Sequence, residues 1–352
     1  MFTPIARRSI ATAVLALLLF PSAVTRARTI RVAAADNLQA VVDGSTGGDV
    51  LLLGPGTYGG FRIHDRHFTA AQPLIIKAAP GARPLILGHG YDGYLAHLAN
   101  SSYIVLDGLA MENSNQPIYC ITVDHLILAH LEIHNTGQEI IHVQGTSRYV
   151  DILNCRLYDT GHTRDEWCEG IYIGMGQPPF QNVEHVWIEE NEIFATGHAE
   201  GINIKSRSYH ITIRGNRVHD IAPGTATQYN QAAISFEAAD LTFRPGVDPD
   251  LWVENNEVWQ VRFGRWANGI QVSTAGGKIV NNHIHDCAEF GLEFNDYNRG
   301  PGVFTTWLFG NRIEKCAAGA ANPTDLPRKE TDPGPNPNQP QTWYAATRTE
   351  AR

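Results

Sequence analysis

The chain has 352 residues, with 27 basic and 36 acidic side chains and a formal net charge of −9. This acidic balance argues against a nucleic-acid-binding protein, which needs a basic surface. Charged residues make up only 18% of the chain, below the typical ~25%, and glycine is abundant at 33 residues. Low charge with many glycines is typical of a turn-rich β protein.

The first 27 residues have the plan of a cleaved export signal. Arg7 and Arg8 form a positive start, an apolar run over 11–20 follows, and small residues precede position 28. The run is about ten residues, shorter than the ~20 that a membrane span needs. Without this segment, 325 residues remain, with 24 basic and 36 acidic side chains and a net charge of −12. We therefore expect a secreted or periplasmic protein without a membrane span; twin-arginine export is a second interpretation of Arg7 and Arg8.

The next segment carries a helix-start pattern. Asp36 followed by Gln39 combines an N-cap acid with an amide three residues later. We expect a short helix over 37–42, and then a first strand and turn over 48–58. Such a helix would cover the open end of a repeating β structure, where apolar core and strand edges are otherwise exposed.

An apolar-x-apolar-x-x-Asn-x-apolar pattern then repeats along the chain. It is complete at 186–193, 211–218 and 251–258, and its second half recurs at 279–284 and 308–313. Between most copies lies a short strand of the Ile-x-Ile kind, at 141–143, 171–173, 202–204, 234–236, 270–272 and 292–294. Because alternate residues of a strand point to opposite sides, the apolar residues are expected to point inward.

Two or three short strands per repeat, without an amphipathic helix between them, predict a solenoid in which each coil buries its apolar side against its neighbours. Over roughly 36–317 the pattern resembles the right-handed parallel β-helix proteins of the pectate-lyase-like superfamily. The resemblance implies an all-β, single-stranded right-handed parallel β-helix over 28–320, with a short N-terminal capping helix. The repeat ends after Cys316, and the Pro-rich residues 321–352 are expected to form an extended or disordered tail.

The register also predicts ladders of identical side chains. Five asparagines hold one slot in successive coils: Asn191, Asn216, Asn256, Asn282 and Asn311. At the ~4.8 Å spacing of neighbouring strands their amides can bond along the stack, and asparagine tolerates the left-handed conformation of a sharp corner. Cys287 and Cys316 would stack on adjacent coils. They could form a disulfide there or stay as two buried thiols, and the sequence leaves both alternatives open.

Polar residues form outward columns on the Ile-x-Ile strands. One column includes His142, Tyr172 and Asn203. Another, at the strand starts, holds three acids, Glu139, Glu169 and Glu200. Stacked carboxylates repel one another unless a cation, shared protons or a base such as Lys205 compensates. We therefore expect a substrate or Ca²⁺ site at this column; solvated carboxylates splayed apart at a corner are the alternative.

A narrower resemblance concerns two of these coils. The segment from Glu200 to Ser206, which contains Lys205, resembles the Glu-x-x-x-x-Lys-Ser strand of the chondroitinase-B and alginate-lyase family, and 169–174 resembles the coil before it. Those enzymes cleave uronate-containing polysaccharides by β-elimination, with calcium neutralising the uronate and a lysine removing the C5 proton. The resemblance implies that Glu200 binds calcium and that Lys205 is the base, with Glu169 as the nearest substitute for the family's other calcium-binding acid. The family's arginine is missing from 232–237, which leaves Arg207 or Tyr172 as the candidate acid.

Other residues near this face complete the candidate site. Catalytic candidates are Lys205, Glu237 and Tyr172, and substrate-binding candidates are His142, Asn203, Arg207, Trp167 and Tyr229. The sequence thus favours an exported polysaccharide lyase acting as a monomer on a uronate-containing glycan, with Ca²⁺ and no organic cofactor. A glycoside hydrolase or epimerase, with Glu200 and Glu237 as paired acids, and a non-catalytic glycan-binding or cell-envelope protein remain alternatives.

The spacing of the histidines in the sequence does not suggest a metal site. His134, His219 and His285 share a column, but other residue types separate them. Their spacing of ~10 Å or more is too large for joint ligation, since metal–nitrogen distances are ~2.1 Å. We expect His219 and His285 to make corner hydrogen bonds with the aspartates that follow them.

Overall fold

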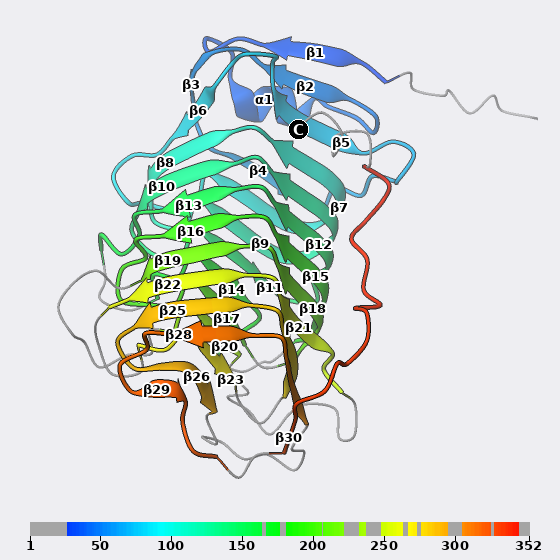
Figure 1. The fold of residues 1–352 in the computed structure, drawn as a ribbon. Helices are drawn as coiled ribbons and strands as arrows, with labels where there is room; N and C mark the ends of the chain where they lie inside the picture. The colour runs from blue at the N-terminus through cyan, green and yellow to red at the C-terminus, as the bar shows by residue number, and fades with distance from the viewer. Residues whose placement is uncertain are drawn as a thin grey trace, which may run out of the picture.

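Parallel strands stacked in coils account for nearly all of the structure, a computed structural model (Figure 1). It describes residues 27–163, 167–176, 181–205, 207–221, 232–236, 248–262, 267–272, 276–294, 305–324 and 327–344. All pairings between the named strands are parallel, which confirms the predicted right-handed β-helix. Among the described residues, no helix is long and apolar enough to cross a membrane.

The coils present three faces, each a ladder of strands. The tail face, along which the C-terminal segment runs, contains β1 (Thr29–Val32), β2 (Val50–Leu53), β5 (Leu74–Ala78), the second halves of β7 (Ala96–Asp107) and β9 (Ile118–Ala129), β12 (Arg148–Leu153), β15 (Val183–Glu189), β18 (Ser208–Arg214), β21 (Leu251–Glu254), β24 (Gly277–Val280), β27 (Thr306–Phe309) and β30 (Arg328–Lys329). The glutamate face contains β4 (Phe61–His64), the first halves of β7 and β9, β11 (Ile141–Gln144), β14 (Ile171–Ile173), β17 (Ile202–Ile204), β20 (Ile234–Phe236), β23 (Ile270–Val272), β26 (Phe290–Phe294) and β29 (Gly319–Ala321). The histidine face contains β3 (Gly56–Tyr58), β6 (Pro84–Leu87), β8 (Ala110–Ser114), β10 (Glu132–Thr136), β13 (Arg156–Tyr158), β16 (Glu192–Phe194), β19 (Arg217–Ile221), β22 (Glu257–Val261), β25 (His283–Cys287) and β28 (Arg312–Glu314).

The apolar positions of the repeat fill the interior of the coils. Ile188, Ile213 and Val253, which share one slot on the tail face, are completely buried. Glycine before the short strands has a steric cause: a Cβ atom on Gly201 would lie 2.5 Å from Cγ1 of Val218 and 2.8 Å from the backbone oxygen of the next coil. At Gly201 the missing Cβ atom lets the two faces approach this closely.

The predicted asparagine ladder is confirmed and is buried. Nδ2 of each asparagine donates to Oδ1 of the next at 2.9–3.0 Å, from Asn191 through to Asn311. The left-handed corner residue is not the ladder asparagine, however, but the residue before it, for example Glu190 or Asn255. The ladder asparagines instead use their side chains to satisfy backbone groups at the corner.

The N-terminal end is capped by a helix, as predicted, but the cap residue differs. Helix α1 (Leu38–Asp43) begins after Asn37, whose side chain accepts the N–H of Ala40. Asp36 instead accepts the N–H of Ala33 in the turn before the helix. Asparagine is as good an N-cap as aspartate, so the two adjacent candidates were not distinguishable by residue type. Strand β1, which precedes the helix, was not predicted.

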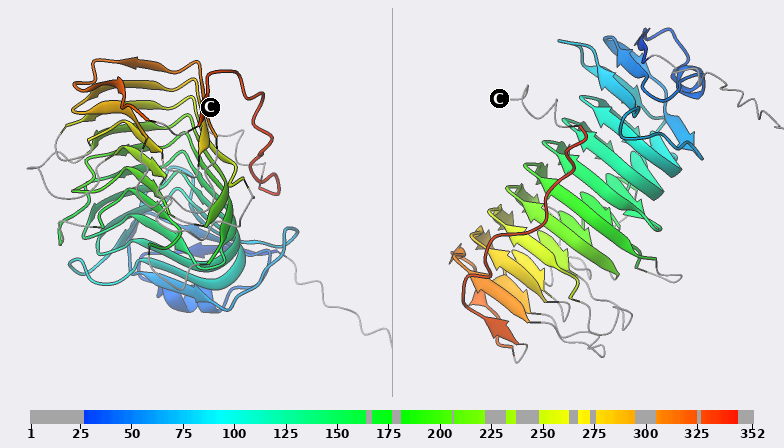
Figure 2. Two further views of the ribbon diagram at one scale, coloured as in Figure 1. Left: turned by 90° about the horizontal axis from the view of Figure 1, so that it is seen from below. Right: turned by 90° about the vertical axis from the view of Figure 1, so that its right-hand side faces the viewer.

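The C-terminal segment is extended, and its described part packs on the solenoid. Strands β29 and β30 add to two faces after the sequence repeat ends, and residues 330–344 then run back along the tail face (Figure 2). Its polar contacts are hydrogen bonds from Asn336 to Thr212 and Glu254, from Asn338 to Asp250, from Gln341 to the Tyr149 carbonyl and from Tyr344 to Asp107. Trp343 packs against Tyr103 and a small buried cluster around Val105 and Ile127.

Removal of this packing should measurably lower stability. We expect Trp343→Ala to reduce the free energy of unfolding by about 1–2 kcal/mol, less than for a fully buried tryptophan because the ring is only partly covered. Trp167→Ala is the control, since that ring is 54% exposed. Denaturant unfolding of both variants measures the difference, and equal midpoints would show that the segment adds nothing.

All five cysteines are thiols in the structure. Cys287 and Cys316 lie on adjacent coils, as predicted, where the N–H of Ala317 bonds the carbonyl of Cys287. A hydrogen bond joins the thiols of Cys287 and Cys316. It raises the pKa of Cys287 and lowers the pKa of Cys316 to about 7. Of the two alternatives, the structure has the pair of thiols.

Candidate functional site

Three stacked carboxylates are the central feature of the glutamate face. Glu139, Glu169 and Glu200 stand just before β11, β14 and β17, on successive coils joined by backbone hydrogen bonds of 3.1–3.2 Å. Their exposed fractions are only 5%, 3% and 3%. The alternative of solvated carboxylates splayed apart is therefore wrong, because the packed coils on both sides cover these side chains.

Amide and imidazole groups surround the carboxylates. Nε2 of Gln116 donates to Glu139 at 2.6 Å, and Nδ2 of Asn203 donates to Glu169 at 3.2 Å. Nδ1 of His142 lies 3.7 Å from Oε1 of Glu139. Hydrogen bonds to a carboxylate favour its charged form, whereas burial opposes it. The amides of Gln116 and Asn203 thus favour the charged forms of Glu139 and Glu169, against the effect of burial.

The outward column predicted from the Ile-x-Ile strands is confirmed by the strand register. His142 pairs with Tyr172, Tyr172 with Asn203, and Asn203 with Ser235 on the next coil. Asn203 is completely buried, and Tyr172 is 9% exposed. This column therefore lies directly beside the glutamates, on the same side of the strands.

Aromatic rings extend this column toward the N-terminal coils. Tyr94 stacks on Tyr119 at 4.5 Å between centroids, Tyr119 meets His142 at 5.3 Å, and His142 meets Tyr172 at 4.5 Å. Nζ of Lys205 lies 5.2 Å from the centroid of Tyr172. Burial lowers the pKa of His142 to about 4, so this imidazole is neutral at neutral pH. The result is a strip of aromatic and neutral polar groups that ends at a lysine.

The structure brings most of the predicted site residues together. Glu169, Glu200, His142, Tyr172, Asn203 and Lys205 all lie on β11, β14, β17 or within two residues of them. Arg207 is half-buried at the corner before β18, and Trp167 is exposed on the loop before β14. Glu237 and Tyr229 lie outside the described residues.

Three residues of this strip were missed from the sequence. Tyr119 belongs to β9, Gln116 stands two residues before β9, and Tyr94 stands before β7. Both strands are 12 residues long and pass from the glutamate face to the tail face, so the short Ile-x-Ile signal is not visible in them. Extension of the His142 column by one coil at the repeat spacing would have reached Tyr119.

The same outward column ends at a carboxyl group with a shifted pKa. Burial raises the pKa of Glu293 to about 7, and the nearby Glu289 adds to the shift. Its Oε2 accepts the amide of Asn268 at 2.8 Å. Because the folded state binds this proton more tightly than the unfolded state, the contribution of Glu293 to stability is fully present at low pH and is lost as pH rises from about 4.5 to about 7.

Glu293→Gln should remove this pH dependence. We expect the variant to equal the wild type near pH 4 and to exceed it by about 1–2 kcal/mol at pH 8, since water still reaches part of the carboxyl and screens the effect. Urea unfolding across this pH range measures the gap. If the free energies of unfolding of the variant and the wild type differ by the same amount at every pH, the raised pKa of Glu293 is contradicted.

Comparison with solved structures places this architecture among known folds. An alginate lyase from Paenibacillus sp. str. FPU-7 aligns with a TM-score of 0.66 at 19% identity, over 84% of this chain and 98% of that chain. The A-module of the mannuronan C-5 epimerase AlgE6 from Azotobacter vinelandii gives 0.54 at 13% identity, over 86% and 87%. This chain has the parallel β-helix fold that these proteins share. The resemblance stated from the repeat is confirmed as a likeness of fold.

A third structure of this fold is that of an enzyme named for a different activity. The catalytic unit of a GH87 α-1,3-glucanase from Streptomyces thermodiastaticus strain HF3-3 aligns with a TM-score of 0.52 at 12% identity, over 84% of this chain and 64% of that chain. No protein-family model and no curated protein sequence matches the chain. Fold alone does not fix function, so the activity has to be argued from the site.

Proposed function

We propose that the chain is an exported polysaccharide lyase that cleaves a uronate-containing glycan by β-elimination on the glutamate face. The observation that carries the proposal is the buried column of Glu139, Glu169 and Glu200 on the coils that also carry Tyr172 and, over its ring, Lys205. Buried acids without a role are costly, and such groups gather at functional sites. The alginate lyase named above has this fold and supports the choice of a uronate substrate.

The donor set suits calcium. Carboxylate and amide oxygens are the ligands that Ca²⁺ prefers, and Glu169, Glu200 and Asn203 offer both kinds on adjacent coils. Oδ1 of Asn203 is buried and has no hydrogen-bond partner among the described residues. When bound, calcium would neutralise the carboxylate of the uronate and so acidify its C5 proton. We place Glu169 and Glu200 as its ligands.

Lys205 is the proposed base and Tyr172 the proposed acid. The amine of Lys205 takes the C5 proton, the C5–H electron pair forms the C4–C5 double bond, and the C4–O bond breaks. The leaving oxygen then takes the hydroxyl proton of Tyr172. A base must be neutral to act, and acidic neighbours oppose this for a lysine unless their charge is neutralised.

The remaining candidates would bind the sugar chain. His142, neutral at neutral pH, and Asn203 can exchange hydrogen bonds with sugar hydroxyls. The exposed ring of Trp167 can stack on a sugar face, and Tyr229 and Arg207 remain proposals for flanking contacts. Glu237 stays a proposed catalytic partner of Glu200. We expect a monomer that binds a polysaccharide or oligosaccharide.

An epimerase is the second candidate. Epimerisation at C5 begins with removal of the same proton, and the mannuronan C-5 epimerase module has this fold. The two reactions differ in the next step, since an epimerase returns a proton to C5 and leaves the chain intact. The same cluster around Lys205 would serve both.

A substrate panel separates these functions. The purified chain is incubated with alginate, pectate and glycosaminoglycans, with added calcium or with a chelator. The proposal predicts ultraviolet-absorbing unsaturated product from at least one polyuronate, and loss of that product in the chelator. Reducing ends without absorbance would indicate a hydrolase, and unchanged chain length with altered uronate stereochemistry would indicate an epimerase. No change in any polymer would favour a non-catalytic glycan-binding protein.

A further inference from the structure

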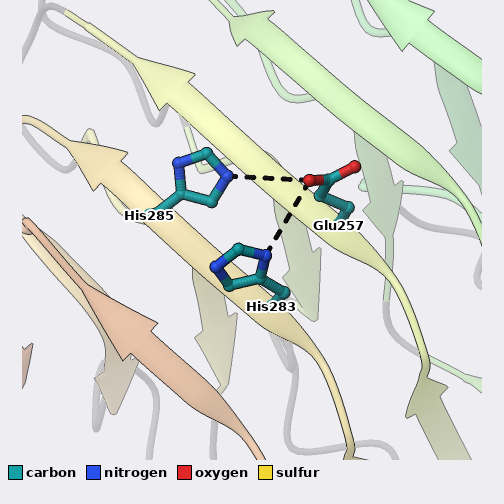
Figure 3. Close-up of side chains that lie close together, drawn as sticks. All are labelled: Glu257, His283 and His285. Atoms are coloured by element: carbon teal, nitrogen blue, oxygen red, sulfur yellow. Dashed lines mark ion pairs between the residues drawn. The ribbon is translucent and has the colours of Figure 1, made fainter.

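The histidine face carries a cluster of metal-type ligands outside the proposed catalytic site. Glu257 begins β22, and the register pairs it with His283 on β25. His285 follows two residues later on the same strand, so both imidazoles point to the same outer side. Nδ1 of His283 and Nε2 of His285 each lie 3.8 Å from Oε1 of Glu257, as Figure 3 shows.

The opposite nitrogen of each imidazole is held by another carboxylate. Nε2 of His283 lies 3.1 Å from Oε1 of Glu314, and Nδ1 of His285 lies 2.6 Å from Oδ2 of Asp286. These hydrogen bonds lower the pKa of both acids. A carboxylate that accepts the N–H of one nitrogen leaves the lone pair of the other available for a ligand. Both available lone pairs therefore belong to the nitrogens that face Glu257.

Glu257 is itself oriented by its neighbours. Its second oxygen, Oε2, lies 3.9 Å from Nε of Arg217 on the preceding coil. The ring of Trp259, also on β22, is parallel to that of His285 at 6.0 Å between centroids. Arg217 thus lies on the Oε2 side of this carboxylate, and Oε1 is the oxygen that faces both histidines.

We propose that Glu257, His283 and His285 form a binding site for a divalent transition metal such as Zn²⁺. Two imidazoles and one carboxylate are a common zinc ligand set, and a fourth position is left for water. Tetrahedral bonds of ~2.1 Å separate ligands by about 3.4 Å. Each imidazole nitrogen would therefore need to move only a few tenths of an ångström closer to Oε1 of Glu257, and all three ligand atoms already lie within 4.8 Å of one another. The side chains are 18–45% exposed, so a metal can enter from solvent.

The chemistry separates this site from the glutamate column. Imidazole nitrogen favours zinc, copper or nickel, whereas an all-oxygen site favours calcium. The histidine site also links two adjacent coils near the C-terminal end of the solenoid. Bound metal should therefore stabilise the fold by mass action, independently of any activity.

Titration of the untagged chain with zinc chloride tests the proposal. Isothermal titration calorimetry should show one tight site, and His285→Ala or Glu257→Gln should abolish it. Glu314→Gln should weaken binding by about 10–100-fold, as expected for a partner behind a ligand. His134→Ala is the matched control, because His134 lies on the same face 3.3 Å from Glu112 and should leave the affinity unchanged.

The melting temperature with and without zinc is a second measurement, which shows whether a variant that fails to bind zinc is still folded. Zinc should raise the melting temperature of the wild type and of Lys205→Ala, but not that of Glu257→Gln. Wild-type zinc affinity in His283→Ala, or no saturable site in the wild type, would overturn the proposal. Because Lys205→Ala must keep the zinc site, failure here and failure of the lyase proposal are distinguishable.

Discussion

Lys205→Ala should reduce the rate of unsaturated product formation from a cleaved polyuronate by about 10²–10⁴-fold, the usual contribution of a general base. Lys205 follows β17 directly, and Nζ lies 5.2 Å from the centroid of Tyr172 beside the glutamate column. Removal of its amine leaves the C5 proton without an acceptor, while the carboxylates that are proposed to hold calcium and substrate stay in place. The expected loss is therefore in kcat rather than in KM.

The matched control for this variant is Lys278→Ala. Lys278 also lies over an aromatic ring, 5.6 Å from the centroid of Trp252, and it pairs with Asp250, but it belongs to the tail face. The control should keep wild-type kcat even if the fold is slightly less stable. Similar activity in Lys205→Ala and Lys278→Ala would remove Lys205 from the mechanism.

Asn256→Ala should lower the free energy of unfolding by about 3–5 kcal/mol. Oδ1 of Asn256 accepts the backbone and side-chain N–H groups of Asn216 at 2.9 and 3.0 Å. Its Nδ2 donates to the carbonyl of Ile213 and to Asn282, both at 2.9 Å. Because the site is 1% exposed, water cannot replace these partners, and each buried group left unsatisfied costs about 1–3 kcal/mol.

Asn311→Ala tests whether burial causes this effect. Asn311 occupies the last slot of the ladder and is only partly buried. Water can reach the groups that it leaves, so we expect a loss nearer 1 kcal/mol. Denaturant unfolding followed by circular dichroism measures both variants. Equal losses would contradict the view that a buried, continuous ladder holds the corner.

The fold could be predicted from the sequence because each coil repeats the same short sequence pattern. The asparagine slot recurs in five successive coils and the Ile-x-Ile strand in six, and the structure places both as predicted. The C-terminal segment was less readable. Its contacts with the tail face are made by isolated amides such as Asn336 and Gln341, which have no period and meet partners more than 80 residues away.

The candidate site could be predicted only in part, because strand register alone does not determine it. A column such as Glu139, Glu169 and Glu200 follows directly from the register, because its members occupy one slot. The cluster of Glu257 with His283 and His285 joins two neighbouring slots, so a search along single columns cannot find it. The burial of the carboxylates also depends on packing by both adjacent coils, which register alone does not give.

Mass spectrometry of the products formed by the wild-type chain from a polyuronate tests the central claim most directly. Elimination breaks the C4–O bond without adding water, so every new non-reducing end should be lighter by one water molecule than a hydrolysis product, and it should carry a double bond. The proposal predicts this unsaturated series, absent in Lys205→Ala. A fully hydrated series, or an uncut polymer at all calcium concentrations, would contradict it.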